Sequence, residues 1–274
     1  MPKHRLNTIS VTCCCIELLN DDVESFSTAS GFLWRVSTRV FLITNWHVVT
    51  GVHAFRGQHL DNGRCPSSLR VHYNHVVELP NDQLQILPHS ITVPLFHDFH
   101  NPLWFEHRFR SAHYIDVIAL DISSSLGEHI AAVRCVNDFV YDDLVEFVGA
   151  DILVIGYPLG SGGGNLPIYK RGSIATEPQF SWKDRPAFLV DCRTSGGMSG
   201  SPVIRMVFGP AALSSGQILM DRIQSGEFLA IYSGRLKDDD NVASIGIAWR
   251  ASVIGELMSN PAPGRRDVEV PIAF

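Results

Sequence analysis

The sequence is poor in charged residues and has no long uninterrupted hydrophobic run. Only 18% of its 274 residues are charged, against roughly a quarter in an average soluble protein, so a disordered chain is excluded. No stretch reaches the ~18 consecutive apolar residues of a membrane-spanning helix. The 22 Lys and Arg residues are scattered and outnumbered by 28 Asp and Glu residues. We therefore expect neither a nucleic acid nor a membrane as a partner.

Cysteines are too few and too clustered for a disulfide framework. The chain has six, and three of them are adjacent, at Cys13, Cys14 and Cys15. We expect these three to lie in a buried strand, where cysteine serves as a small hydrophobic residue. The apolar stretch 9–19 is interrupted by polar residues and has no small-residue cleavage signal, so no signal peptide is predicted. Together these features predict a cytoplasmic protein with reduced thiols.

Short apolar runs rich in Val, Ile and Phe make up most of the chain, and Gly, Pro, Asn, Asp and Ser separate them. This pattern predicts a mostly β protein, and the lack of regular strand–helix alternation favours barrels or sandwiches. One terminal helix is predicted at residues 251–258, where we expect it to seal a barrel end. Candidate strands cover residues 10–18, 31–37, 39–45, 69–73, 116–122, 150–157, 168–174, 187–191, 202–206, 227–233 and 244–249.

Three segments carry side chains of the types that enzymes use in catalysis. His47 ends an apolar strand, Asp116 places a carboxylate inside another predicted strand, and Ser199 lies in a glycine-rich turn. Each has an ordinary structural explanation when taken separately. Together they meet the needs of nucleophilic acyl transfer, in which a histidine takes the proton of a serine hydroxyl and a carboxylate orients the imidazole. Ser195 and Ser201 are rival nucleophiles on spacing alone.

These segments resemble the trypsin-like, chymotrypsin-fold serine peptidases, closest to the bacterial HtrA-like and glutamyl-endopeptidase-like branches. The histidine, aspartate and serine blocks read TNWHVV at 44–49, DVIAL at 116–120 and GMSGSP at 197–202, in the family's order. The matches SGFL, VIGYP, IYSG and IGIA extend the similarity over roughly residues 10–258. The resemblance implies an all-β fold of two six-stranded antiparallel β-barrels with a C-terminal helix.

The resemblance also implies roles and domain limits. The N-terminal barrel, 1–130, would carry His47 as general base and then acid, and Asp116 as its orienting carboxylate. The C-terminal barrel, 131–274, would carry Ser199 as the nucleophile. A composition shift with little strand signal separately places the connection at 123–143. The backbone N–H groups of Gly197 and Ser199 would form the oxyanion hole, and the nucleophile motif favours Ser199 over its rivals because it lies between two glycines.

Two departures from the family pattern change what is expected of regulation. Met198 stands where many secreted members have an aspartate that receives a new N-terminus, so activation by zymogen cleavage is not expected. The segment after Met258 is too short for a PDZ domain, so HtrA-like oligomer behaviour is not assumed. A small protease with no visible inhibitory segment needs a trigger, such as an activating or regulatory protein, or a narrow specificity.

Substrate recognition is expected near the nucleophile. The resemblance places Arg193 and Thr194 in the primary pocket, where Arg193 would suit an acidic substrate residue unless it points to solvent or pairs with a neighbouring aspartate. Tyr232, Ser233 and Gly234 lie in the segment that would pair with substrate backbone as an added strand. A protein or peptide in extended conformation is therefore the expected partner.

Four histidines of the segment 96–113 raise the question of a metal. Their spacing fits no tight zinc template and no paired cysteine lies near them, so a packed loop is favoured and neither metal nor other cofactor is expected. These residues are His97, His100, His107 and His113.

Two other functions compete with hydrolysis by a serine endopeptidase. A regulated or inactive peptide-binding module on the same fold would keep the cleft without the chemistry. An α/β-hydrolase esterase fits poorly, because its nucleophile motif requires glycine where Ser201 stands, and its catalytic residues occur in a different chain order.

Overall fold

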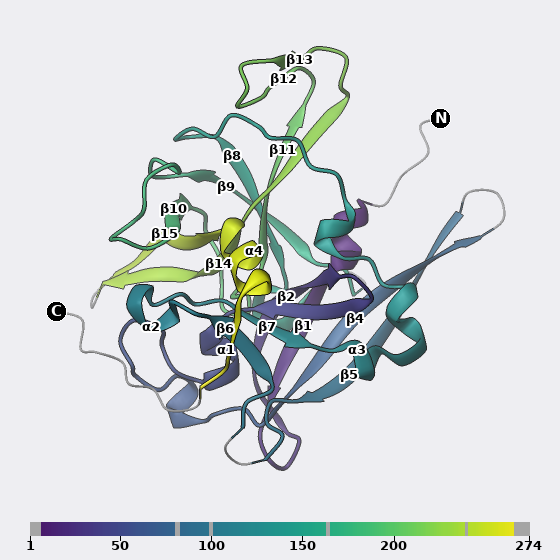
Figure 1. Ribbon diagram of the computed structural model, residues 1–274, viewed down its shortest axis with the longest axis vertical. Helices are drawn as coiled ribbons and strands as arrows, with labels where there is room; N and C mark the ends of the chain where they lie inside the picture. The colour runs from purple at the N-terminus through teal and green to yellow at the C-terminus, as the bar shows by residue number, and fades with distance from the viewer. Residues whose placement is uncertain (1–6, 80–82, 99–100, 163–164, 239–240, 266–274) are drawn as a thin grey trace.

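A computed structural model describes the chain except residues 1–6, 80–82, 99–100, 163–164, 239–240 and 266–274. The described residues form two β structures stacked along the long axis of the molecule, a closed barrel in the upper half of Figure 1 and a twisted sheet in the lower half. Short helices lie at their margins. Within the described part of the chain, no helix is long and apolar enough to cross a membrane.

The N-terminal half forms an eight-stranded antiparallel sheet in the order β16-β6-β7-β3-β2-β1-β4-β5. This mostly-β arrangement agrees with the predicted class, but the sheet is not closed and has more strands than the expected six-stranded barrel. Two additions account for the difference, because β5 extends one edge as half of a long hairpin with β4, and β16 arrives from the C-terminus to extend the other. The strands are β1 Cys13–Leu19, β2 Ser25–Val36, β3 Arg39–Thr44, β4 Ser68–Leu79, β5 Gln83–Pro94, β6 Trp104–His107, β7 Ile118–Asp121 and β16 Pro261–Pro263.

The C-terminal half forms the closed six-stranded barrel that was predicted, in the order β10-β15-β14-β11-β8-β9. Its apolar interior includes Val154, Phe188, Val203 and Ala248. The strands are β8 Asp151–Gly156, β9 Ile168–Ile174, β10 Ala187–Asp191, β11 Pro202–Phe208, β14 Gln224–Asp238 and β15 Asn241–Arg250.

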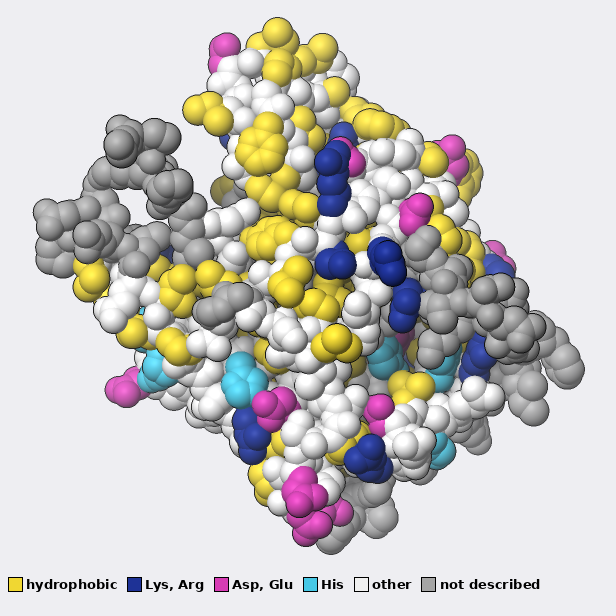
Figure 2. Space-filling view, turned by 180° about the vertical axis from the view of Figure 1, so that it is seen from behind, with side chains coloured by type: hydrophobic (Ala, Val, Ile, Leu, Met, Phe, Trp, Pro, Cys, Tyr) yellow, Lys and Arg dark blue, Asp and Glu magenta, His cyan; other side chains and the backbone are white. Residues whose placement is uncertain are grey.

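A small hairpin of β12, Ala211–Ala212, and β13, Ile218–Leu219, projects from this barrel at one end of the molecule. Hydrophobic side chains gather on the projection (Figure 2), among them Ile218, Met220 and Ile223, which are 62%, 66% and 88% exposed.

Short helices occupy the turns between strands. The α-helices are α1 Trp46–Thr50, α2 Arg110–His113, α3 Ser123–Leu126 and α4 Ser252–Ser259, and the 3-10 helices are η1 Thr8–Thr12, η2 Asp61–Gly63, η3 Gly127–Ala131, η4 Val136–Asp138 and η5 Pro158–Gly160. The region 123–143, expected to connect the two halves, holds α3, η3 and η4 and no strand.

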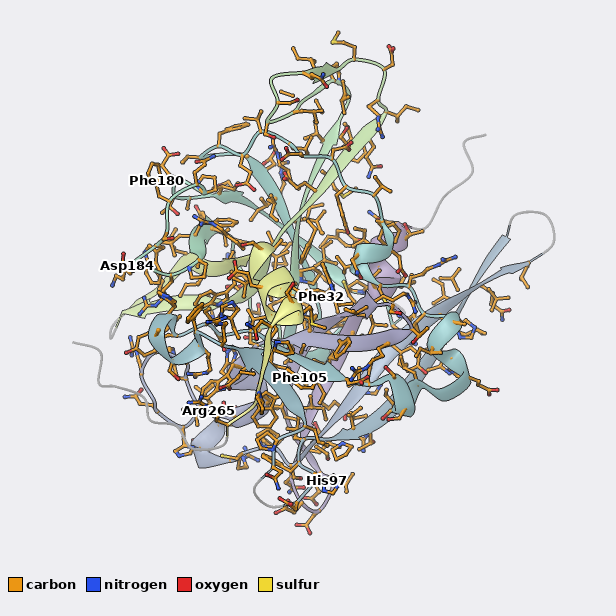
Figure 3. The ribbon with its side chains drawn as sticks, in the orientation of Figure 1. Phe32, His97, Phe105, Phe180, Asp184 and Arg265 are labelled. Carbon is orange, nitrogen blue, oxygen red and sulfur yellow. The ribbon has the colours of Figure 1, made fainter. Side chains whose placement is uncertain are left out.

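The C-terminal helix α4 lies one residue further along the chain than predicted and occupies the junction of the halves rather than a barrel end (Figure 1). Its buried Val253, Ile254 and Leu257 share an apolar cluster with residues of both halves. Phe32 of β2 belongs to this cluster and lies near the centre of the molecule (Figure 3). The halves are therefore joined by a continuous apolar core, which holds residues from each in one relative position.

The adjacent cysteines lie in β1, as predicted, and all six cysteines are free thiols. Cys13, Cys14 and Cys15 are buried. Burial raises the pKa of Cys13 to about 12, so its thiol stays protonated and unreactive near neutral pH.

Candidate active site

The pairing of β3 with β7 brings His47 and Asp116 together. Thr44, the last residue of β3, pairs with Ile118, the first residue of β7. Because the strands are antiparallel, the residues just after β3 and just before β7 meet at the same sheet edge. Asp116 lies two residues before β7, in a loop after α2, and not inside a strand as predicted. The loop position lets its carboxylate turn back toward α1, where His47 lies.

Two hydrogen bonds join the pair. The carboxylate Oδ2 of Asp116 lies 2.7 Å from Nδ1 of His47, and Oδ1 accepts a bond of 2.9 Å from the His47 backbone N–H. Asp116 is only 1% exposed. A carboxylate bound to Nδ1–H holds the ring in one orientation and leaves the lone pair of Nε2 free to accept a proton.

Neighbouring donors keep Asp116 ionised. Burial by itself raises the pKa of this carboxyl, but the His47 imidazole, the hydroxyl of Ser233 and the His47 backbone N–H outweigh it and hold the pKa below its usual range. The Ser233 hydroxyl donates directly to Oδ2. Asn45, fully buried, donates from its side chain to the Asp116 carbonyl at 2.7 Å and fixes the loop that carries the carboxylate.

Ser199 lies in the turn between β10 and β11, and two glycines shape this turn. Gly197 and Gly200 have φ values of 88° and 87°, a region that other residues rarely adopt. A Cβ on Gly200 would lie 2.1 Å from the carbonyl oxygen of Ser30, so this position also needs glycine for space. In the part of the chain that the structure describes, no hydrogen bond uses the backbone N–H of Gly197 or Ser199.

The hydroxyl of Ser199 points to β14. It donates to the carbonyl oxygen of Ser233 at 3.2 Å, and no hydrogen bond of the described residues joins it to His47. Ser233 therefore contacts both other groups, because its own hydroxyl binds Asp116 and its carbonyl binds Ser199. The hydroxyl must leave this bond before it can give its proton to the imidazole.

Ser30 of β2 connects the two halves at this site, a role that the sequence analysis missed. Its backbone N–H donates to the carbonyl of Ser199 at 2.8 Å. Its hydroxyl donates to the carbonyl of Gly197 at 2.7 Å and accepts from the N–H of Tyr157 at 2.9 Å. The available signal in the sequence was a serine beside a glycine at the start of an apolar run, SGFL at 30–33. Nothing in that run shows which carbonyl the serine reaches.

The residues expected to bind substrate lie in different environments. Arg193 is exposed. Thr194 and Tyr232 are buried, and their hydroxyls bond to each other at 2.6 Å inside the second barrel. Gly234 is half-buried next to Ser233 on β14. The assignment of these residues to substrate binding stays a prediction.

Of the two rival serines, Ser201 differs from Ser199 in access and Ser195 does not. Ser201 has no exposed surface, and its hydroxyl makes no hydrogen bond among the described residues. Ser195 is half-buried in the same turn as Ser199.

The histidines of the segment 96–113 are dispersed, apart from His100, which lies outside the described residues. His97 is exposed in a turn at one end of the molecule (Figure 3). His107 is buried in β6, where its Nε2 lies 3.1 Å from Glu256, and His113 ends α2. The described residues that could share a metal ion are three other histidines, His75, His89 and His129, which lie outside this site.

The site thus holds a buried carboxylate paired with an oriented imidazole, and Ser233 contacts both this carboxylate and the serine of the glycine turn. The family model of the trypsin-like peptidase domain matches residues 29–207. The chain belongs to the trypsin-like peptidase family, and its class is serine-type endopeptidase. A search of curated proteins found no match.

Solved structures similar to this chain are trypsin-like and HtrA-type serine proteases. The Rv3671c protease of M. tuberculosis in its active form is 17% identical, with 97% of this chain and 89% of that chain covered, at a TM-score of 0.49. The HtrA-type protease AlgW with a tripeptide is 13% identical. The match covers 92% of this chain and 62% of that chain, at a TM-score of 0.46. The Grass clip serine protease of Drosophila is 11% identical. The match covers 93% of this chain and 70% of that chain, at a TM-score of 0.48.

Proposed function

We propose that this protein hydrolyses peptide bonds through a catalytic triad of Ser199, His47 and Asp116 and an acyl-enzyme intermediate. Ser199 attacks the scissile carbonyl while Nε2 of His47 takes the hydroxyl proton. His47 then gives this proton to the leaving amine, whose departure leaves the acyl group on Ser199. Water, deprotonated by the same imidazole, releases the acyl group as a carboxylic acid and restores the serine.

The observation that carries this proposal is the buried bond of 2.7 Å between Asp116 and Nδ1 of His47. Burying an ionised carboxylate away from solvent costs free energy. A histidine with a purely structural role does not need such a partner. The carboxylate is kept charged by the donors around it. It can therefore stabilise the imidazolium that forms when Ser199 loses its proton.

Backbone donors for the oxyanion are proposed at Gly197 and Ser199. The carbonyl of Gly196 accepts a hydrogen bond from the N–H of Leu159 at 2.7 Å. In a trans peptide the carbonyl and the next N–H point in opposite directions, so the N–H of Gly197 points away from this carbonyl's direction. The Gly196–Gly197 peptide is thus held with its N–H directed away from Leu159. Loss of one such donor typically lowers kcat by about 100- to 1,000-fold.

An extended peptide is the proposed substrate shape. β14 pairs with β11 only as far as Ile231, which lies opposite Pro202. Just beyond this pair, the backbone N–H of Gly200 donates to the carbonyl of Tyr232. From Ser233 onward, β14 has a strand partner only on its β15 side among the described residues. The open edge lies beside Ser199, where a substrate strand can pair with it.

The alternative, a regulated or inactive peptide-binding module, has one observation in its favour. The Ser199 hydroxyl bonds to Ser233 and not to His47. However, catalytic hydrogen bonds are often long or poorly aligned without substrate and tighten when it binds. Reactivity of Ser199 toward an acylating or phosphonylating probe therefore distinguishes the two functions.

The test is labelling of the purified full chain with a fluorophosphonate probe, followed by peptide mapping. We expect the label on Ser199, and we expect Ser199→Ala to lose both the label and cleavage of an unfolded protein substrate. Ser195→Ala is the matched control, since it removes a half-buried hydroxyl from the same turn, and it should keep both. Retained cleavage in Ser199→Ala would reject the triad. A wild-type chain that binds peptide but is neither labelled nor active would favour the binding module.

A further inference from the structure

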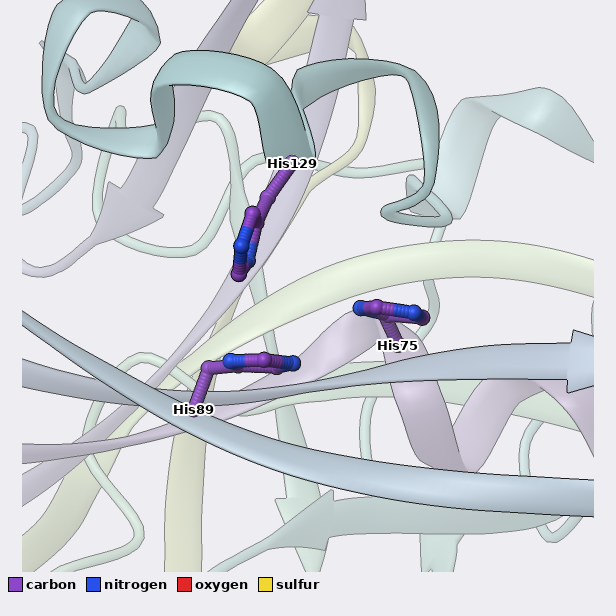
Figure 4. A group of neighbouring side chains, drawn as sticks. All are labelled: His75, His89 and His129. Carbon is purple, nitrogen blue, oxygen red and sulfur yellow. The ribbon is translucent and has the colours of Figure 1, made fainter.

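Three histidines distant in the sequence meet beside the hairpin of β4 and β5. His75 lies on β4, His89 on β5 and His129 on η3 (Figure 4). Each offers one ligand nitrogen, and these atoms all lie within 4.8 Å of one another. None of the three belongs to the group formed by Ser199, His47 and Asp116.

Strand register explains how two of them become neighbours. Tyr73 pairs directly with His89 across the hairpin. His75 lies two residues along the same strand face, so it is the diagonal neighbour of His89. The rings of His75 and His89 are parallel, with centroids 5.0 Å apart. Figure 4 shows the two stacked rings, with the His129 ring approaching from the side of η3.

Two ring nitrogens of this cluster lack partners. Nδ1 of His75 and Nε2 of His89 are buried and make no hydrogen bond among the described residues. Buried polar atoms in native proteins are nearly always paired with protein, water or an ion. Each of these two nitrogens is therefore available to a partner such as an ion.

His129 is oriented by a second residue. Its Nδ1 lies 2.9 Å from the hydroxyl of Tyr73. When Nδ1–H donates to this hydroxyl, the Nε2 atom keeps a free lone pair. A hydrogen bond from the non-ligating nitrogen to a neighbouring oxygen is the usual support of a histidine that binds a metal.

The His129 ring lies close to both other rings. The His129 ring centroid lies 4.3 Å from that of His89 and 5.7 Å from that of His75. At these distances, three neutral imidazoles can offer three lone pairs to one ion.

We propose that His75, His89 and His129 form a binding site for Zn²⁺ or a similar divalent transition-metal ion, with water in a fourth position. Imidazole nitrogen suits Zn²⁺, Cu²⁺, Ni²⁺ and Co²⁺, and three protein ligands plus water complete a tetrahedral shell. Bond lengths of about 2.0–2.1 Å place tetrahedral ligands roughly 3.3 Å apart. The rings need to turn and approach by roughly an ångström or more, breaking the stack of His75 on His89.

Binding at this site would link two parts of the fold. η3 belongs to the segment that connects the halves, and the hairpin of β4 and β5 forms the edge of the first sheet. An ion bound by all three histidines would join η3 to this hairpin. Because the ion would bind the folded chain more tightly than the unfolded chain, it should raise the melting temperature.

The test uses the full chain freed of metal with a chelator. Zn²⁺ affinity is measured by competition with a chromophoric chelator, and Co²⁺ is added as a spectroscopic probe of tetrahedral nitrogen coordination. We expect one strong site per chain, a tetrahedral Co²⁺ spectrum and a higher melting temperature with Zn²⁺. His89→Gln and His129→Gln should each lower the affinity by about 100-fold and lose the thermal effect.

His97→Gln is the matched control, because His97 is exposed in a turn outside the cluster, and it should bind like wild type. Circular dichroism of each variant establishes that it is folded. Equal Zn²⁺ affinity in wild type and in a folded His89→Gln or His129→Gln chain would overturn the proposal. Binding that is lost in His47→Gln but kept in both cluster variants would overturn it too, since the ion would then belong to the pair of His47 and Asp116.

Discussion

At the scale of single residues, the site depends on a charge that the fold keeps away from water. Asp116 receives a ring N–H, a backbone N–H and a hydroxyl, and these come from α1 and β14. Each donor stabilises the ionised form, which explains how a carboxyl without solvent contact has a lowered pKa. The function of Asp116 is therefore tested by removing its charge while keeping its shape.

Asp116→Asn should lower kcat by about 10,000-fold, because an amide cannot hold His47 in the tautomer that accepts the Ser199 proton. The measurement is steady-state cleavage of a peptide substrate. Asp121→Asn is the control, because this aspartate lies on the adjacent β7, pairs with Arg39 near the surface and should leave kcat within a few-fold. Similar kcat values for the two variants would contradict the role of Asp116.

At the scale of strands, the pairing of β11 with β14 places a glutamate in an unfavourable position. Glu227 faces Arg205 across the strands, yet Oε2 of Glu227 is buried without a partner among the described residues. Burial and the nearby Glu146 raise the pKa of Glu227 to about 8, with Asp143 adding to the effect and Arg205 opposing it. The folded chain thus keeps a proton that the unfolded chain loses at much lower pH.

This difference predicts that Glu227 makes the protein less stable as pH rises from about 4.5 to 8, because the folded state binds more protons in that range. Glu227→Gln mimics the protonated acid and should raise the free energy of unfolding at pH 8.5 by roughly 1–2 kcal/mol, a value reduced for partial exposure. At low pH, where both states are protonated, the gain should vanish.

Urea unfolding at several pH values measures this effect, and Glu177→Gln, at an exposed position of the same half, is the charge-matched control. A gain from Glu227→Gln that does not change with pH would contradict the explanation.

At the scale of the whole molecule, the C-terminal segment returns to the first half. After α4, β16 pairs with β6, and the N–H of Gly264 donates to the carbonyl of Trp104 at 2.9 Å. This segment crosses the predicted boundary between domains 1–130 and 131–274, and the boundary itself stays a prediction. Three features thus connect the trypsin-like halves. They are the pairing of β16 with β6, the apolar core around α4, and the hydrogen bonds of Ser30 to Ser199 and Gly197.

A chain that ends at Asn260 should therefore unfold at a temperature about 5 °C lower than wild type, because it loses β16 and uncovers Trp104, which is 1% exposed. Calorimetry measures the shift. A chain that ends at Arg265 keeps β16 and serves as the control. Equal melting temperatures of the two shortened chains would contradict a stabilising role for β16.

Much of the fold could be predicted because strand formation leaves a local pattern. The bounds of β9 and β10 agree with the predicted 168–174 and 187–191. β5 and β6 were missed, since β5 carries polar residues and prolines and β6 has only four residues. The triad candidates were found because three motifs retain the family's residues and order. The pairing of Asp116 with His47 agrees with that expectation, whereas the position of Asp116 outside a strand was not predicted.

By itself, the sequence determined the β class and the buried cysteine strand, because each depends on residues within one short segment. The six-stranded barrel and the three residues proposed for catalysis followed from motifs shared with a family. Only the tertiary structure decided that Ser233 supports Asp116, that Ser30 holds the turn of Ser199, and that His75, His89 and His129 form a cluster. These contacts depend on which strands become neighbours and in what register. Long-range pairing of this kind results from burial of the whole core, and no local pattern encodes it.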